Sequence, residues 1–533
     1  MYRSFRACTS WPRSSWLILG TFSVAWLSAA TVLVWLGVAD GEILSDDAYY
    51  YFEISRNAAL GEGFTFDGVN PTNGFHPLWG WLLVPVFLAF PTSAWTPIHI
   101  ALTISGMCVV ASAVCVFLLF ERHGRTEAGL ASAVLWLFNP FTWVLSGRGL
   151  EGPLNVLCIM IAVLVLDSIR LRGTYHSRDA VALGGAFGLS LLARTDNVLL
   201  VAAFGLVLLG DVVRGRLRPA VALRRAAVTG ATTALVVSPW LAWSLATFGS
   251  VVQSSHQAKS LFDLYGRLPA LTGETGTGLV AGMVRNLGLI ASHNAQYIAG
   301  EEWSGIERGW TVLAWAATVA VLATASAVLF RSRRGSGPAL APVALFAVVH
   351  IAWYGWIGRS YYNWYFLPVV LVCSLLVADA LGRAWASGRR TARAAVGVTI
   401  ALIAISAPRL GARHIEGWAP RQGESAFLGS RAAERLAPLP AGSRAGAWNA
   451  GRIGYFASFH SRAVVVNLDG VVNNEIVRHA RTRPYESYIL EHIDWLLEDP
   501  RELRKFVSED RMVRFVRDHV SAEGQILGGP PDD

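Results

Sequence analysis

Long apolar runs separated by short polar segments recur along this chain and limit what it can fold into. They cover about residues 16–38, 77–120, 128–146, 152–168, 180–210, 227–247, 309–330, 339–357, 364–382 and 395–409. About 20 apolar residues suffice for one helix to cross the hydrocarbon core of a bilayer. Only 15% of the 533 residues are charged, against roughly 25% in an ordinary soluble protein. The pattern predicts an all-α polytopic membrane protein with about 10–12 transmembrane helices.

The positive charge of the chain is concentrated between the apolar runs. Arginine clusters occupy short segments at residues 214–225, 331–334 and 383–393. Short basic loops mark the cytoplasmic face of a membrane protein. Basic residues also precede the first apolar run, which predicts an uncleaved first span with its N-terminus in the cytoplasm. The clusters lack interleaved aromatic residues, so no nucleic-acid partner is expected.

The apolar run at residues 77–120 is long enough for two crossings. If residues 77–92 and 98–120 both span the bilayer, the basic loop at residues 121–127 falls outside, against the positive-inside trend. Either one of the two runs is re-entrant, or the charge rule fails at this loop. The sequence leaves both alternatives open.

Two polar segments and a polar tail interrupt the apolar pattern. Residues 39–76 and 248–308 are expected as outer loops of a transmembrane domain that extends over residues 1–409. Residues 410–533 are richer in charge and alternate between apolar and polar stretches. We expect them to form a small α/β C-terminal domain, with a buried strand at residues 463–468 and an amphipathic helix at residues 488–497.

The most informative stretch is residues 45–79, with the sequence SDDAYYYFEISRNAALGEGFTFDGVNPTNGFHPLW. Two carboxylates, Asp46 and Asp47, open it, and an aromatic segment follows that suits a helix lying in the membrane interface. Ser45 or Asp46 could cap this helix. Because neighbouring helical residues point about 100° apart, we expect different roles for the two carboxylates. One would face a reacting centre and act as a base toward a hydroxyl, while the other fixes the helix.

Basic side chains at the same depth are candidates to stabilise a departing phosphate. Lys259, in the second polar segment, is one of only two lysines in the chain, and His256 lies beside it. Arg359 precedes an aromatic cluster at a predicted span boundary. That cluster, which includes Tyr361 and Tyr362, is equally typical of an aromatic belt.

Two further polar groups interrupt apolar runs. Arg194 lies within the run at residues 180–210, where a charge usually marks a buried pair, a water-filled cavity or a helix break. It is expected either to contact phosphate or to pair with Asp196 in a turn between two short helices. Glu151 lies in a Gly-Pro turn at a membrane face, where it either lines a site or is only part of the turn.

These motifs resemble the GT-C superfamily of polytopic glycosyltransferases that use lipid-phosphate sugars, such as protein mannosyltransferases, lipid A aminoarabinose transferases and mycobacterial arabinofuranosyltransferases. The resemblance rests on the stretch at residues 45–79 and, in the expected order, on GLEGPL (149–154), LARTDN (192–197), SPWLAW (238–243), FGS (248–250), AKS (258–260), YYNWYF (361–366), GAWNAG (446–451) and VNLDG (466–470). GLEGPL departs from the more usual GLETPL or GMETPL.

The resemblance implies a GT-C-like fold with two juxtamembrane helices in the first outer loop and Asp46 or Asp47 as the catalytic base. It also implies inverting transfer of a sugar from a polyprenyl-phosphate donor to an envelope glycan, lipid or protein acceptor. The site would face the extracytoplasmic side of the cell membrane, as would the C-terminal domain. Some relatives use a divalent metal, and the sequence contains no independent ligand set, so metal use stays open.

Within this hypothesis the remaining candidates divide into two groups. The donor phosphate would be contacted by Lys259, Arg359, Arg194 and His256, and the pocket would be lined by Glu53, Asn73, His76, Glu151, Tyr361 and Tyr362. The alternatives are a polytopic lipid or solute transporter or flippase, and a non-catalytic envelope assembly factor. The absence of internal repeats and the position of the acidic pair at a loop boundary argue against a transporter.

Overall fold

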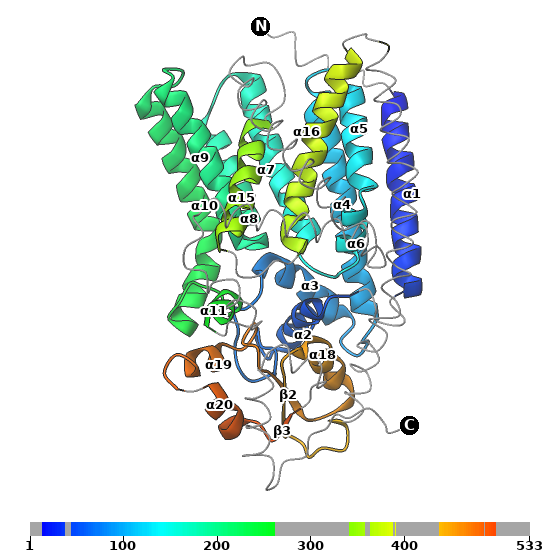
Figure 1. The fold of residues 1–533 in the computed structure, drawn as a ribbon, viewed down its shortest axis with the longest axis vertical. Coiled ribbons are helices and arrows are strands. Elements are labelled where there is room, and N and C mark those ends of the chain that lie inside the picture. The colour runs from blue at the N-terminus through cyan, green and yellow to red at the C-terminus, as the bar shows by residue number, and fades with distance from the viewer. Residues whose placement is uncertain are drawn as a thin grey trace, which may run out of the picture.

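A computed structural model describes the chain over residues 13–37, 44–261, 340–357, 363–386, 390, 436–483 and 485–496. Over these residues it forms a bundle of apolar helices with a small α/β domain at one end (Figure 1). The apolar runs predicted at residues 309–330 and 395–409 lie outside the described residues.

The helices of the bundle lie side by side, with the long ones roughly parallel (Figure 1). They are α1 (Arg13–Gly37), α4 (Thr96–Glu121), α5 (Thr126–Leu137), α6 (Pro140–Ser146), α7 (Gly152–Arg172), α8 (Ser177–Ala193), α9 (Val198–Val213), α10 (Pro219–Phe248), α15 (Leu340–Ile357) and α16 (Leu367–Ala386). Five described helical segments are long and apolar enough to cross a membrane: Thr96–Glu121, Gly152–Arg172, Thr195–Val213, Pro219–Phe248 and Trp364–Arg383. The chain is therefore a multi-pass membrane protein, and the predicted helical membrane fold is confirmed.

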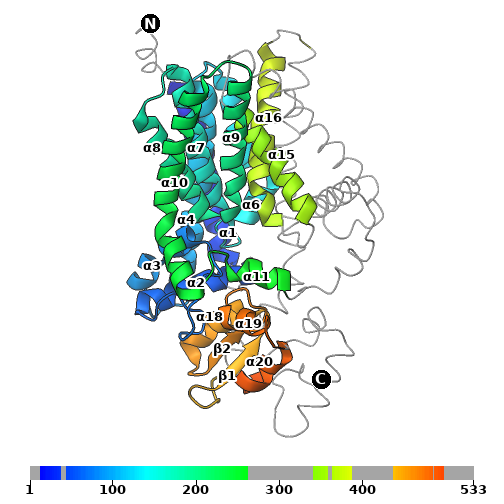
Figure 2. The same cartoon turned by 90° about the vertical axis from the view of Figure 1, so that its left-hand side faces the viewer.

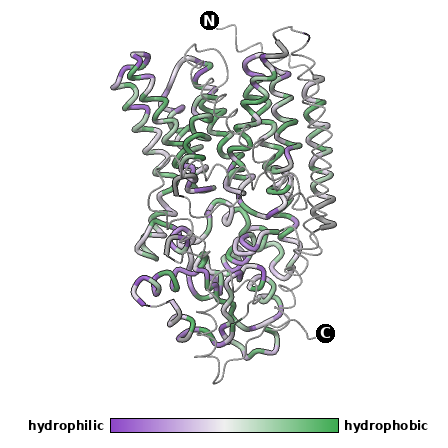
Figure 3. The backbone as a smooth tube through the Cα atoms, in the orientation of Figure 1, coloured by the Kyte–Doolittle hydropathy of each residue, from purple (hydrophilic) through white to green (hydrophobic). Residues whose placement is uncertain are grey.

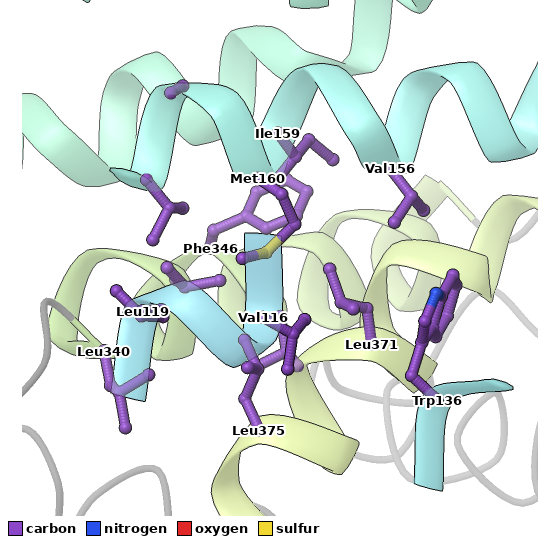
Figure 4. Packing of buried hydrophobic residues seen from close by; sticks show 14 of the residues in the cluster. Val116, Leu119, Trp136, Val156, Ile159, Met160, Leu340, Phe346, Leu371 and Leu375 are labelled. Carbon is purple, nitrogen blue, oxygen red and sulfur yellow. The ribbon is translucent and has the colours of Figure 1, made fainter. Parts of the chain in front are cut away.

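Hydrophobic residues predominate along the helices of the bundle (Figure 3), and they are found both in its buried centre and on its outside. In the close view, Met160 of α7 and Phe346 of α15 meet Leu375 of α16 in one buried cluster (Figure 4). Large apolar side chains such as Leu235 and Leu209 are instead exposed on the outside of α10 and α9. A helix that is apolar on both its packed and its outward face is typical of a bilayer environment.

Helices α8 and α10 approach each other through two glycines. Gly184 and Gly188 lie one turn apart on α8, and a Cβ atom on either would come within 2.5 Å of α10, at the Thr229 carbonyl oxygen and the Val236 Cβ respectively. Small residues four apart allow membrane helices to pack backbone against backbone. Gly185, between them, faces open space.

Two further helices lie at the end of the bundle that carries the C-terminal domain. They are α2 (Asp46–Leu60) and α3 (Pro77–Ala89), and Figures 1 and 2 both place them below the long helices. With 13 residues, α3 is about 20 Å long, which is too short to cross a core of about 30 Å. Of the two runs in residues 77–120 only α4 is therefore long enough to cross, and the basic turn between α4 and α5 lies at the opposite end of the bundle (Figure 1).

The aromatic residues of α2 do not face lipid, contrary to the sequence prediction. Tyr49, Tyr50, Tyr51 and Phe52 are all buried. The rings of Tyr49 and Phe52 pack on Tyr455 of the C-terminal domain, with centroids 5.6 and 6.0 Å away. The interface helix is thus sandwiched between the bundle and this domain, because the domain covers the face that we assigned to the membrane surface.

The C-terminal domain is built on a parallel three-stranded sheet of order β2–β1–β3. Its elements are β1 (Arg444–Ala447), α18 (Ala450–His460), β2 (Val464–Asn467), α19 (Asn474–His479), α20 (Tyr485–His492) and β3 (Trp495–Leu496). The buried strand predicted at residues 463–468 is confirmed. The helix predicted at residues 488–497 was wrong at its end, because the main chain of Asp494 bonds to Arg444 and residues 495–496 join the sheet.

The glycine contact between α8 and α10 gives a stability prediction. Replacement of Gly188 by Ala should lower the free energy of unfolding by about 1–3 kcal/mol, because the helices must move apart to admit the methyl group. Thermal unfolding in detergent measures the change. Gly185→Ala is the matched control, since it adds the same methyl group toward open space, and equal effects of the two variants would contradict the packing argument.

Candidate active site

A cavity of about 700 Å³ lies between the end of the bundle and the C-terminal domain. Its walls come from α2, the loop before α3, the turns at the start of α7 and α9, α11 (Ser254–Leu261), α15 and the 3₁₀ turn η6 (Asn363–Phe366). Val471 adds a contact from the C-terminal domain. The volume is in the range of small-molecule sites in proteins.

Asp47 is the member of the acidic pair that lines this cavity. It lies in the first turn of α2 and is half-buried. Burial raises the pKa of its carboxyl group to about 6, as do the nearby carboxylates of Asp46 and Glu151, while Lys259 and Arg148 oppose the rise. A carboxylate with a pKa close to neutral is suited to accept a proton from a substrate hydroxyl.

Asp46 is directed away from the cavity and into the C-terminal domain. Its two oxygens accept hydrogen bonds from the main-chain N–H groups of Gly451 at 3.1 Å and Arg452 at 2.9 Å. These are the second and third residues of α18, whose N–H groups have no partner inside the helix. Asp46 therefore caps a helix, but the helix belongs to the C-terminal domain. Ser45, at the N-cap of α2, makes no side-chain capping bond.

A chain of buried charges forms the floor of the cavity toward the bundle. Arg194 forms an ion pair with Glu151 and a second, at 3.0 Å, with Asp196. Tyr354 donates a hydrogen bond to Asp196 at 2.7 Å, and Tyr51 donates one to Glu151 at 2.9 Å. The pairing of Arg194 with Asp196 that the sequence offered is confirmed. Because Arg194 also lines the cavity, its contact with a phosphate stays a prediction.

Glu151 and His76 have pKa values that are shifted by this setting. Burial alone would raise the pKa of Glu151, but Arg194 and His76 hold it below its usual range. Burial lowers the pKa of His76 to about 4, so its ring is neutral at pH 7. The ring nitrogen Nε2 of His76 lies 3.8 Å from Glu151 and faces the cavity.

Lys259 reaches the cavity from the last turn of α11. Its ammonium group donates a hydrogen bond to the hydroxyl of Tyr365 at 2.6 Å and lies 5.4 Å from the centre of that ring. The Arg194 guanidinium lies 4.9 Å from the same ring. Tyr365 thus holds two cations on one wall of the cavity. His256, one turn earlier on α11, is exposed at the rim.

Two of the predicted pocket residues do not line the cavity. Glu53 points to the opposite side of α2, where it bonds to Arg56 at 3.4 Å and accepts a hydrogen bond from Ser458 at 3.1 Å. Burial raises the pKa of Glu53 to about 8. Asn73 is completely buried beside the cavity and bonds to protein groups on both sides of its amide. Both side chains contribute to the contact with the C-terminal domain.

Arg359, Tyr361 and Tyr362 lie outside the described residues. The structure adds cavity residues that sequence reasoning did not single out: Tyr50, Tyr51, Gln253, Trp353, Tyr354, Trp364 and Tyr365. Most of them are aromatic. In the sequence they are indistinguishable from the many aromatic residues of a membrane protein, and only the arrangement of α2, α15 and η6 brings them together.

Asp469 is a third buried aspartate near the acidic pair. It comes from the loop after β2, and its carboxylate accepts a hydrogen bond from the main-chain N–H of Val471 at 2.8 Å. Burial raises its pKa to about 7, and the charges of Asp47 and Asp46 add to the rise. In the part of the chain that the structure describes, no three His, Cys, Asp or Glu side chains are arranged to hold a metal ion.

Comparison with known proteins reveals the fold. No protein-family model matches the sequence, and no curated protein matches it. The structure is similar to that of ArnT from Cupriavidus metallidurans in the apo state, with a TM-score of 0.51, 14% identity and coverage of 89% of each chain. The same protein bound to undecaprenyl phosphate gives a TM-score of 0.50 at 14% identity, covering 86% of this chain and 89% of that one.

A second relative is the Archaeoglobus fulgidus oligosaccharyltransferase tethered with an acceptor peptide. The TM-score is 0.50 at 15% identity, with coverage of 84% of this chain and 64% of that one. The chain therefore spans less than two thirds of the length of this relative. At these identities the likeness establishes the fold, and the chain has the fold of the GT-C glycosyltransferases.

The buried charge network predicts that substitution of Arg194 lowers the stability of the protein more than substitution of Lys259. Replacement of Arg194 by Met should lower the free energy of unfolding by about 3–5 kcal/mol, because two buried carboxylates lose their cation. Lys259→Met is the matched control, since its hydrogen bond is to the neutral hydroxyl of Tyr365 and Asp47, whose charge it offsets, is only half-buried. Thermal unfolding in detergent measures both, and equal stability of the two variants would contradict the network.

Proposed function

We propose that this protein is a membrane glycosyltransferase that moves a sugar from a polyprenyl-phosphate donor to a hydroxyl-bearing acceptor of the cell envelope, with inversion at the anomeric carbon. The observation that carries the proposal is that Asp47 and Lys259 line one cavity at the boundary between the apolar bundle and the C-terminal domain. A base and a cation at the same site are what transfer from a glycosyl phosphate requires.

In the proposed reaction the acceptor oxygen bonds to the anomeric carbon as the bond from that carbon to the phosphate oxygen breaks. Asp47 takes the proton of the acceptor hydroxyl, and polyprenyl phosphate leaves with the electron pair of the broken bond. Lys259 is the cation placed to stabilise the phosphate. Arg194 lines the same wall, but its two carboxylate partners more than offset its charge, so Lys259 is the cation left for the phosphate.

The lining of the cavity supports a lipid-linked donor. On the side of the bundle its walls include Val198 and Leu199 of α9 and Trp353 of α15, which are apolar residues of membrane helices. On the side of the C-terminal domain they include the polar residues Gln253 and Ser255. An apolar chain can therefore extend along Val198, Leu199 and Trp353 toward the bilayer, beside the charged floor, while its phosphate remains near Lys259. ArnT, of the same fold, has been crystallised with undecaprenyl phosphate.

The charge distribution supports an extracytoplasmic site. The turns that join α4 to α5, α7 to α8 and α9 to α10 lie at the end of the bundle opposite the C-terminal domain (Figure 1). Arginines flank each of them, including Arg122, Arg172 and Arg216. Since basic loops mark the cytoplasmic face, the cavity and the C-terminal domain would face the outside. In this arrangement the domain covers the site.

The donor is identified with the purified protein in lipid and a panel of radiolabelled polyprenyl-phosphate sugars, supplied with candidate acceptors. The wild-type protein should release polyprenyl phosphate with at least one donor. Asp47→Asn should slow release by at least about hundredfold, because a general base is lost. Asp46→Asn is the matched control: it keeps an oxygen for the α18 N–H groups and should remain within about tenfold of the wild type.

Other outcomes would assign other functions. Wild-type rates in Asp47→Asn would exclude this residue as the base. Movement of intact donor across the bilayer without cleavage would assign a flippase instead. Absence of both cleavage and transport with all donors and acceptors would support a non-catalytic assembly role.

The pKa of Asp47 predicts the pH dependence of the reaction. Only the ionised carboxylate can accept a proton, so the transfer rate should rise with pH and reach half its maximum near pH 6. His76, with its pKa lowered to about 4, stays neutral across this range. Because burial raises the pKa of Asp469 to about 7, the profile of Asp469→Asn is the control. It should keep the same rising limb, and loss of that limb would assign it to Asp469.

A further inference from the structure

Four elements meet beside the cavity in a polar junction. We define it by Asn73 from the loop before α3, Ser244 from α10, Ser254 from α11 and Asn474 from α19. Oδ1 of Asn73 accepts hydrogen bonds from the main-chain N–H of Ser254 and from Nδ2 of Asn474, each at 2.9 Å. Nδ2 of Asn73 donates to the hydroxyl of Ser244 at 2.7 Å. The amide of Asn73 thus joins the bundle, α11 and the C-terminal domain.

The junction fixes the start of α11, the short helix that carries Lys259 to the cavity. Ser254 is the first residue of this helix. Besides its bond to Asn73, it donates from its hydroxyl to the main-chain oxygen of Val471 at 2.8 Å. The preceding residue, Gln253, donates to the main-chain oxygen of Phe75 at 2.6 Å. Figure 2 shows α11 between the bundle and the C-terminal domain.

The C-terminal domain holds its side of the junction through Asn474. Oδ1 of Asn474 accepts from the hydroxyl of Thr72 at 2.9 Å and from the main-chain N–H of Asn73 at 3.3 Å. The backbones also touch: a Cβ atom on Gly74 would lie 1.9 Å from the main-chain oxygen of Val471. Two residues beyond the end of α19, Arg481 donates a hydrogen bond to the side chain of Gln257 on α11. The C-terminal domain thus contacts α11 at two points, at Ser254 through Val471 and at Gln257 through Arg481.

We propose that Asn73 and Asn474 are positioning residues for donor binding. They hold α11, and with it Lys259, against the cavity, so that docking of the C-terminal domain and binding of the donor phosphate are coupled. This inference rests on the proposed function. Neither asparagine lines the cavity, so any effect on the donor passes through α11. A coupling of this kind is reciprocal: a bound donor also strengthens the docking of the domain.

The coupling arises because buried hydrogen-bonding groups of the junction are costly to leave without partners. If the Asn73 amide is removed, the Ser254 N–H and the Asn474 amide lose a buried acceptor, and recovery of their hydrogen bonds requires the segments to separate and admit water. The start of α11 then moves relative to the cavity. Asp47 lies on α2, which contributes no residue to the junction. Donor affinity should therefore fall, while the rate of transfer at saturating donor changes little.

The test measures binding of polyprenyl phosphate to the purified full-length protein, together with KM and kcat for the donor. Asn73→Ala and Asn474→Ala should each weaken binding about tenfold, and kcat should stay within about twofold. The double variant should also show about tenfold rather than hundredfold weakening, because both substitutions break one junction. The control is Asn70→Ala, in the same loop, whose amide bonds to Asp67; its affinity should be unchanged.

Limited proteolysis measures the reciprocal effect. Polyprenyl phosphate should slow cleavage of the C-terminal domain in the wild type by severalfold, but not in the two variants. If the asparagine variants do not fold, Ser254→Ala is tested instead, since it deletes only the hydroxyl bond to Val471; a smaller loss of affinity in the same direction is expected.

The outcomes separate this proposal from the proposed function. Wild-type affinity in folded Asn73→Ala and Asn474→Ala, or in Ser254→Ala if it is used, overturns the coupling. A fall in kcat with unchanged affinity also overturns it, because the junction would then act on the base. A wild-type protein that does not bind polyprenyl phosphate at all contradicts the proposed function instead.

Discussion

The contact of Asp46 with the first turn of α18 fixes the geometry on which the candidate site depends. The N–H groups of Gly451 and Arg452 have no partner within their helix, and the helix dipole favours a negative charge at that end. The Asp46 carboxylate meets both requirements at once. Because Asp47 is the next residue on the same helix, its side chain points about 100° away, toward the cavity. One contact thus attaches the C-terminal domain and directs the proposed base.

A second constraint is the placement of charge at the end of an apolar bundle. An isolated charge is expensive there, so charged side chains are retained where they pair or line a cavity. Arg194 illustrates both conditions, because it is bonded to Glu151 and Asp196 and also faces the cavity. The network brings one cation and two carboxylates to the site, so each charge has a partner of opposite sign. Asp47 and Lys259, on separate elements, provide the charges that a reaction would use.

The C-terminal domain therefore does more than cover the cavity, because it also holds the elements that form it. It receives Asp46 at α18, packs Tyr455 against the aromatic face of α2, and bonds to Asn73 through Asn474. It also contributes Val471 to the cavity wall. The contact surface is continuous from α2 to α11, the two helices that present the proposed base and the proposed phosphate ligand. This continuity is the structural basis for a coupling between docking and binding.

The sequence by itself determined the membrane class, the helical bundle and the small strand-containing tail, and it singled out the acidic pair as candidates for the site. These follow from the period and length of apolar runs and from the rarity of charge among them, which are local properties of the chain. It could not decide which aspartate faces the cavity, because that depends on the partner that the other one finds 405 residues away. Likewise, the aromatic face of α2 suits lipid and protein equally well. Only the tertiary structure, by placing the C-terminal domain on that face, decided between them and brought Asp47 and Lys259 to one site.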